Sequence, residues 1–213
     1  MAIIEKVSYT ISNKIGEKAN KSNEEIQVMN YGLFIWIHTI LAYIATILVG
    51  IIIGKTIEVL LISIVASSLK KFSGGVHATS PNRCLIIGII TTLIFTYIYV
   101  FLNKYCGYNF IYAFSIVSIV SCYYIFYKKA PVGTKNKPLK KEETRNRLRK
   151  KLFNRLNVFI AIIILLLIVR LTKISNYDIA MFVYCIELGI ILQTIAITKL
   201  GETIILKLDC FLK

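Results

Sequence analysis

The chain has 213 residues, of which 56% are hydrophobic and 17% are charged, and its formal net charge is +15. A soluble domain of this length carries charge on about a quarter of its residues, and here the apolar residues are clustered into long runs. Composition therefore excludes a separate soluble domain with its own core. It predicts an all-α, polytopic integral membrane protein that forms one domain over residues 1–213. The amino-terminal segment is too charged for a secretory signal peptide, so we expect the first span to target the chain.

Residues 1–30 are predicted to form an amphipathic helix that lies in the membrane interface. Apolar residues recur about every four positions and form one stripe on a helix; they are Ile3, Ile4, Val7, Ile11 and Ile15. Three lysines, Lys14, Lys18 and Lys21, fall outside this stripe. The same pattern is typical of a cytoplasmic helix that packs on the rest of the protein, and both interpretations stay open at this point.

Six apolar segments follow, which predicts about six transmembrane helices. They cover residues 33–53, 57–69, 84–102, 109–127, 157–171 and 179–198. The second is short and could be tilted or partly re-entrant, and the fifth should begin nearer Leu152. Glu187 and Gln193 lie inside the last span, where we expect a structural role, with Glu187 hydrogen-bonded to a neighbour such as Gln193 or a tyrosine. The tail from Lys199 is expected to lie on the surface.

The loop predicted at 128–156 carries most of the positive charge. Between Lys128 and Arg155 there are twelve Lys or Arg and two Glu. Positively charged loops stay in the cytoplasm, so six spans place this loop, residues 70–83 and both termini on the cytoplasmic side. Such a loop also binds anionic membrane lipid. Because the charge is confined to a membrane loop, it gives no indication of nucleic-acid binding.

The segment 73-SGGVHATSPNRC-84 contains the candidate chemistry, His77 and Cys84. A straight helix would hold the two residues roughly 10 Å apart, which is too far for proton transfer. However, the two glycines permit turns, and Ser80 followed by Pro81 is typical of an N-cap and a first helical position. The loop can therefore fold His77 back over the helical turn that bears Cys84.

A cysteine in that place suits acyl transfer. The positive end of the helix and nearby cations (Lys70, Lys71 and Arg83) favour its thiolate. His77 can take the thiol proton and later protonate a leaving amine, and free N–H groups of the first turn can bind an oxyanion. Two other classes stay open, a non-catalytic peptide exporter or permease and a membrane-surface scaffold. With two His and no CxxC pair, neither a metal site nor a cofactor is predicted.

The stretch KKFSGGVHATSPNRC resembles a segment of the accessory gene regulator B (AgrB) family, which are membrane cysteine endopeptidases of Gram-positive quorum sensing. A second stretch, 130-APVGTKNKPL-139, is similar to the family's Ala-Pro-x-x-Thr-x-x-Lys-Pro-hydrophobic block. The resemblance covers essentially the whole chain. It implies cleavage of the C-terminal part of a small AgrD-type precursor through an acyl-enzyme thioester. A Cys or Ser of the peptide then opens that thioester to form a thiolactone or lactone.

The resemblance also implies roles for single residues. Cys84 becomes the nucleophile, and His77 becomes the general base and acid. Lys70 and Lys71 fall where the family carries basic residues, often Arg, and Lys is not equivalent to Arg at a bidentate site. The predicted substrate-binding residues are Lys70, Lys71, Gly75, Arg83, Lys135 and Lys137. The basic loop would dock the acidic segment of the precursor, and the family implies a homodimer in the cell membrane.

Overall fold

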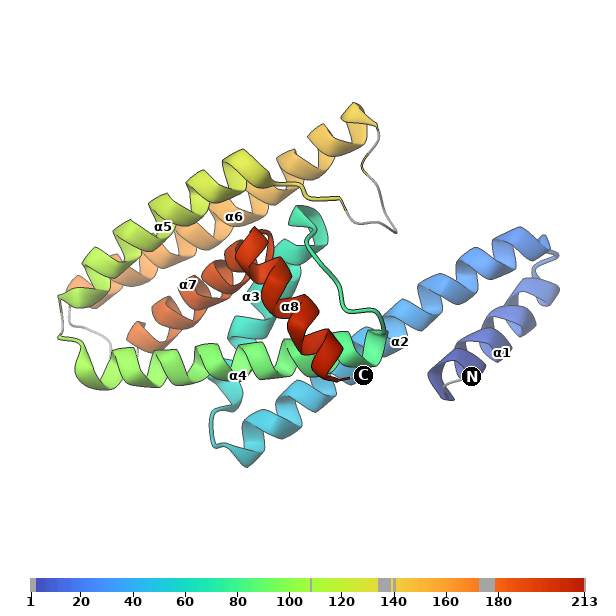
Figure 1. Cartoon of the computed structure of the whole chain (residues 1–213), viewed down its shortest axis with the longest axis horizontal. Coiled ribbons are helices and arrows are strands. Elements are labelled where there is room, and N and C mark those ends of the chain that lie inside the picture. Colours follow the sequence, from blue (N-terminus) through green and yellow to red (C-terminus); the bar gives the residue numbers. More distant parts are fainter. Residues whose placement is uncertain (1–2, 108, 134–138, 140, 173–178, 213) are drawn as a thin grey trace. The chain divides into compact units, whose positions relative to one another are not determined.

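The computed structural model describes residues 3–107, 109–133, 139, 141–172 and 179–212. Eight α-helices account for nearly all of these residues (Figure 1). Their one β-interaction is an isolated parallel bridge between Gly74 and Val132. The prediction of an all-α protein is therefore confirmed. The chain divides into two compact units, Met1–Val49 and Gly50–Lys213.

The first unit contains α1 (Ile3–Lys18) and most of α2 (Asn23–Ile52). A capping box starts α2. The Ser22 hydroxyl accepts from the Glu25 N–H at 3.3 Å, and the Glu25 carboxylate accepts from the Ser22 N–H at 3.0 Å. Val7, Ile11 and Ile15 of the predicted apolar stripe are exposed. The interfacial position of α1 stays a prediction, but its helical form is confirmed.

The second unit is built around α3 (Thr56–Ser73) and α7 (Ile179–Ala196), which pack against each other. Buried residues of α3 recur at helical spacing along one face; they are Val59, Ile62, Val65, Ala66, Leu69 and Ser73. Most of α7 is buried, because α4 (Pro81–Tyr105), α5 (Phe110–Lys129) and α6 (Glu142–Leu171) also contact it. The last helix, α8 (Lys199–Phe211), packs on α7 and α4.

α5 and α6 contact each other through aromatic and cationic side chains. The rings of Tyr123 and Phe153 lie 5.1 Å apart between centroids. The Arg149 guanidinium lies over the Tyr127 ring and donates to the Tyr127 carbonyl at 2.8 Å. These contacts bring the end of α5 beside the beginning of α6, the two helices that flank the stretch 130-APVGTKNKPL-139.

Five of the described helices are long and apolar enough to cross a membrane: α2, α4, α5, α6 and α7. Together they confirm a multi-pass membrane protein. α3 corresponds to the short second span; it has 18 residues and carries Glu58, Lys70 and Lys71. Its length of about 27 Å is close to the thickness of a hydrocarbon core. The tail is also helical, as α8.

Two helices extend beyond the apolar runs that predicted them. α2 begins at Asn23, within the segment expected to belong to the amino-terminal helix, and α6 begins at Glu142, within the expected basic loop. Lys and Arg are good helix formers, and Glu142 and Glu143 lie at the positive end of the α6 dipole. The predicted loop is therefore helical from Glu142 onward, and this basic part of α6 leads into its apolar part.

Candidate active site

The loop between α3 and α4 forms the helix start that the sequence predicts. The Ser80 hydroxyl accepts from the Arg83 N–H at 3.3 Å, and Pro81 is the first residue of α4. The Cys84 N–H donates to the Ser80 carbonyl at 3.0 Å, which is the first hydrogen bond of the helix. Cys84 therefore lies in the first turn of α4, near the positive end of its dipole.

His77 folds back over this turn. Its Nδ1 lies 3.9 Å from the Cys84 Sγ, within hydrogen-bonding range for sulfur. His77 is exposed as a residue, but partial burial of its imidazole, and secondly the charge of Lys70, lower the pKa of His77 from its ordinary value of 6.5. The neutral form then predominates at neutral pH. A neutral imidazole is the form that can accept a thiol proton.

Gly74 and Gly75 make the turn that returns the chain toward α4. Gly74 has φ +72° and ψ −146°, and Gly75 has φ +116°. Residues other than glycine rarely adopt these backbone angles. A Cβ on Gly74 would overlap the Val132 carbonyl oxygen, and a Cβ on Gly75 would lie 3.3 Å from the Ala196 carbonyl oxygen. Gly75 is itself buried against the end of α7.

The two stretches of sequence that resemble the family therefore meet in space. Gly74 forms its bridge with Val132, and the Val132 N–H donates to the Ser73 carbonyl at 2.8 Å. In the chain the two stretches are separated by 45 residues, 85–129. Their contact is made by backbone atoms, so it fixes the position of the segment before His77 independently of most side chains.

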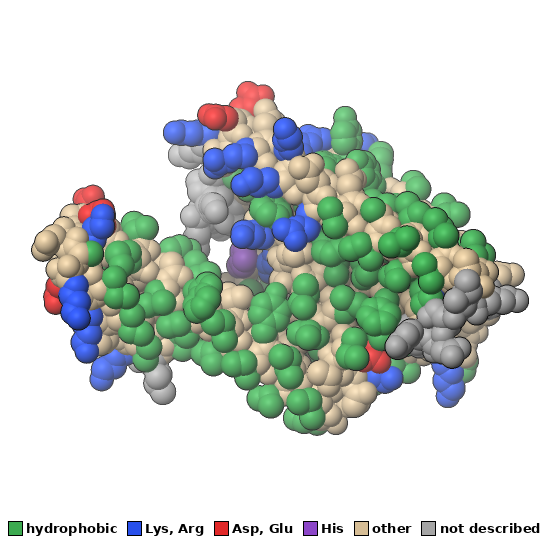
Figure 2. Space-filling view, turned by 180° about the vertical axis from the view of Figure 1, so that it is seen from behind, with side chains coloured by type: hydrophobic (Ala, Val, Ile, Leu, Met, Phe, Trp, Pro, Cys, Tyr) green, Lys and Arg blue, Asp and Glu red, His purple; other side chains and the backbone are tan. Residues whose placement is uncertain are grey.

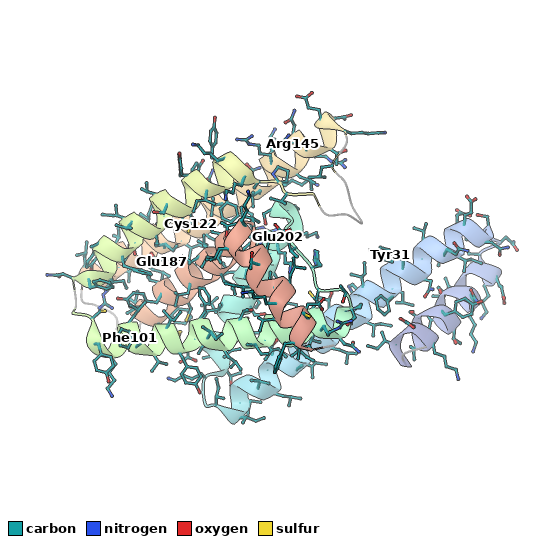
Figure 3. The ribbon with its side chains drawn as sticks, viewed as in Figure 1. Tyr31, Phe101, Cys122, Arg145, Glu187 and Glu202 are labelled. Atoms are coloured by element: carbon teal, nitrogen blue, oxygen red, sulfur yellow. The ribbon has the colours of Figure 1, made fainter. Side chains whose placement is uncertain are left out.

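Gln193 of α7 supports the same turn. Its amide donates to the Ser73 hydroxyl at 2.7 Å and to the Gly74 carbonyl at 3.0 Å. The sequence predicts Gln193 or a tyrosine as the partner of Glu187, whereas the Gln193 amide donates to the loop instead. Figure 3 shows Glu187 on α7, and its two carboxylate oxygens are buried with no hydrogen-bond partner in the described part of the chain.

Asp209 on α8 is a site residue that the sequence did not indicate. Its Oδ1 accepts from the Thr79 N–H at 3.2 Å, and its Oδ2 accepts from the Thr79 hydroxyl at 2.9 Å. Arg83 Nη1 lies 3.3 Å from Oδ1. The carboxyl end of α8 lies beside the beginning of α4 in Figure 1. The only sequence signal was a lone acidic residue at the end of an amphipathic tail, which does not identify a partner 130 residues away.

The predicted cationic residues have different surroundings. Lys70 and Lys71 lie in the last turn of α3, and Lys71 is exposed. The Arg83 side chain is 24% exposed and is paired with Asp209. Lys135 and Lys137 lie outside the described residues. Figure 2 shows other Lys and Arg side chains gathered around the amino-terminal part of α6, where Figure 3 labels Arg145.

Backbone donors in the first turn of α4 are few. Pro81 has no N–H, Arg83 donates to the Ser80 side chain, and Cys84 donates within the helix. Asn82 is the remaining residue of this turn, and no hydrogen bond from its N–H is found among the described residues. Nor does the described part of the chain bring together three or more His, Cys, Asp or Glu that could hold a metal ion.

These features define a multi-pass α-helical membrane protein with a cysteine and a histidine in contact where one helix begins. The family model described as Accessory gene regulator B matches residues 8–197. The chain belongs to this family, whose work is the processing of quorum-sensing peptides in the accessory gene regulator system.

Two curated proteins of Clostridium perfringens are similar over 98% of both chains. The chain is 31% identical over 211 residues to a "Putative AgrB-like protein" of strain SM101 (Type A). It is 30% identical over 212 residues to a "Putative AgrB-like protein 2" of strain 13 (Type A). No solved structure matches the chain. The family match ends at residue 197, before α8, whereas the similarity to the two clostridial proteins covers nearly the full chain.

Proposed function

We propose that the protein is a membrane cysteine endopeptidase that removes the C-terminal part of an AgrD-type precursor peptide. Cys84 is the nucleophile, and His77 is the general base and acid. The observation that carries the proposal is the 3.9 Å separation between His77 Nδ1 and Cys84 Sγ at the start of α4. Catalytic hydrogen bonds are often long without substrate and shorten when it binds. The lowered pKa of His77 supports the base role, since it keeps the imidazole neutral at neutral pH.

The proposed reaction has two stages. His77 Nδ1 takes the proton from Cys84 Sγ, and the thiolate attacks the scissile carbonyl carbon to form a C–S bond. The Asn82 N–H would bind the resulting oxyanion. When the intermediate collapses, the C–N bond breaks and His77 gives its proton to the leaving amine. A thiol or hydroxyl of the same peptide then attacks the thioester, which closes a thiolactone or lactone and releases Cys84.

Cations on the same side of the protein would attract an acidic peptide segment. Lys70, Lys71 and Arg83 lie within the segment that leads to the proposed nucleophile, and Lys135 and Lys137 belong to the basic connection between α5 and α6. Gly75 contributes by its backbone conformation. We place this side of the protein in the cytoplasm, because the connection before α6 carries the largest excess of positive charge.

The test is cleavage of a precursor tagged at its C-terminus and co-expressed with the protein. We expect wild type to release the tagged fragment, and Cys84→Ala and His77→Ala to release none. Cys106→Ala is the matched control, because Cys106 is another half-buried free cysteine, just after the end of α4, and this variant should cleave like wild type. Mass spectrometry of the wild-type protein should also detect the peptide as a thioester on Cys84. Cleavage by Cys84→Ala would reject the proposed centre.

A further inference from the structure

Asp209 occupies a position that a carboxylate would ordinarily avoid. It lies in the last turn of α8, at the negative end of the helix dipole, where acidic side chains are disfavoured. Only 3% of it is exposed, and a buried carboxylate is costly unless it is paired. Its contacts compensate for both effects, because they supply an N–H, a hydroxyl and a guanidinium.

These contacts join the two sides of the proposed centre. Thr79 follows His77 by two residues, and Arg83 directly precedes Cys84. The Asp209 carboxylate contacts both Thr79 and Arg83. The backbone carbonyl of Asp209 accepts a further hydrogen bond from Arg83 Nη1 at 3.3 Å. The Asp209 side chain therefore connects the loop segment that bears His77 to the helical turn that bears Cys84.

The helix that carries Asp209 is itself fixed at its other end. Thr198 caps α8, with its hydroxyl accepting from the Gly201 N–H at 3.2 Å. Leu200, Ile204 and Phe211 of α8 are exposed apolar residues, which suit the surface of a membrane. α8 thus runs as a brace from the end of α7 to the beginning of α4, rather than as a loose tail.

We propose that Asp209 is a positioning residue for the proposed endopeptidase centre, which it serves by setting the separation of His77 and Cys84 through Thr79 and Arg83. The proposal rests on the proposed function. Asp209 does not act on the substrate itself, because its oxygens are occupied by Thr79 and Arg83. It also places a working part of the centre on α8, outside the region that the family model matches.

The variants separate charge from shape. Asp209→Asn keeps an acceptor for the Thr79 N–H but removes the charge that pairs with Arg83, whereas Asp209→Ala removes every side-chain contact. Because hydrogen bonds to charged groups are strong, we expect kcat to fall about 10-fold in Asp209→Asn and about 100-fold in Asp209→Ala. KM should change little. Glu202→Gln is the control, because Glu202 is an exposed acid on the same helix (Figure 3), and its kcat should equal that of wild type.

A second readout needs no precursor. The full-length protein in detergent is alkylated with iodoacetamide between about pH 5 and pH 8, the range in which histidine titrates, and the labelling of Cys84 is measured by peptide mass spectrometry. In wild type we expect an inflection that His77→Ala abolishes. Asp209→Ala should abolish it too, Asp209→Asn should retain part of it, and Glu202→Gln should leave it in place.

The outcomes are distinct. If Asp209→Ala keeps both kcat and the labelling inflection, the proposal is overturned. If the melting temperature shows that Asp209→Ala does not fold, Asp209→Asn is the deciding variant. An unchanged kcat and an unchanged labelling profile in Asp209→Asn would then overturn the proposal. Failure of the proposed function gives a different pattern, in which Cys84→Ala still cleaves the precursor. The labelling profiles then still report whether Asp209 couples His77 to Cys84.

Discussion

Gly74→Ala should break the junction between the two stretches of sequence that meet beside the proposed centre. The backbone at Gly74, with φ +72° and ψ −146°, lies in a region that is almost restricted to glycine, and occupying it with alanine costs about 1–3 kcal/mol. The new Cβ would also overlap the Val132 carbonyl oxygen. Relieving that overlap would separate Val132 from Ser73 and disturb the Gln193 hydrogen bond to Gly74.

Each hydrogen bond contributes about 1 kcal/mol, so the total penalty is about 3–5 kcal/mol. Since 1.4 kcal/mol is a factor of ten, the equilibrium ratio of assembled to disrupted turn should fall on the order of 100-fold or more. Cleavage of the tagged precursor should fall with it. The melting temperature of the purified protein should fall as well.

Two other glycines separate the causes. Gly54 also has a positive φ, of +66°, but a Cβ there meets nothing within 4 Å. Gly88 lies within α4, again with nothing within 4 Å. Gly54→Ala should cost only the strain, about 1–2 kcal/mol, and Gly88→Ala should be neutral or stabilising by up to about 1 kcal/mol. If Gly74→Ala has the same melting temperature as Gly54→Ala and cleaves the precursor like wild type, the backbone contact with Val132 does not fix the turn.

Three further predictions concern the surroundings of His77. Ser80→Ala should lower the free energy of unfolding by about 1 kcal/mol by removing the cap of α4; Ser80→Asn should restore the melting temperature, and failure to do so would contradict the capping role. Gln193→Leu should cost about 1–3 kcal/mol, because it leaves the buried Ser73 hydroxyl without its donor; an unchanged melting temperature would argue against this. Lys70→Gln should raise the pKa of His77, since the Lys70 charge lowers it. Cleavage needs the neutral imidazole, so on acidification the activity of Lys70→Gln should decline at a higher pH than that of wild type. Lys71→Gln is the control and should leave the pH profile unchanged. A shift of the Lys70→Gln profile to lower pH would contradict the assignment.

Local signals predicted the part of the site that local chemistry determines. Ser80 and Pro81 start α4 as expected, and His77 returns to Cys84 because the turn before it is made of glycines. The runs of apolar residues likewise predicted the five described helices that are long and apolar enough to cross a membrane. They could not predict where the helices begin, because hydropathy changes at the membrane surface while the helical backbone of α2 and α6 continues past it.

The supports of the site were not predictable from one sequence. Gln193 reaches Ser73 across 120 residues, and Asp209 reaches Thr79 across 130. No spacing rule connects positions so far apart, because their contact depends on how α7 and α8 pack. For Gln193 the general expectation that a polar residue in a span finds a partner was right, but the partner was the loop rather than the neighbouring glutamate.

The packing of α3 against α7 has a consequence for biosynthesis. The proposed nucleophile and base are complete once the ribosome has made the first 84 residues, but α7, Gln193 and Asp209, which hold them in place, are translated last. A nascent chain that ends before α7 leaves the inner face of α3 without its main partner. The order of the helices along the chain thus predicts that the proposed centre is held in place only after α7 and α8 have been made.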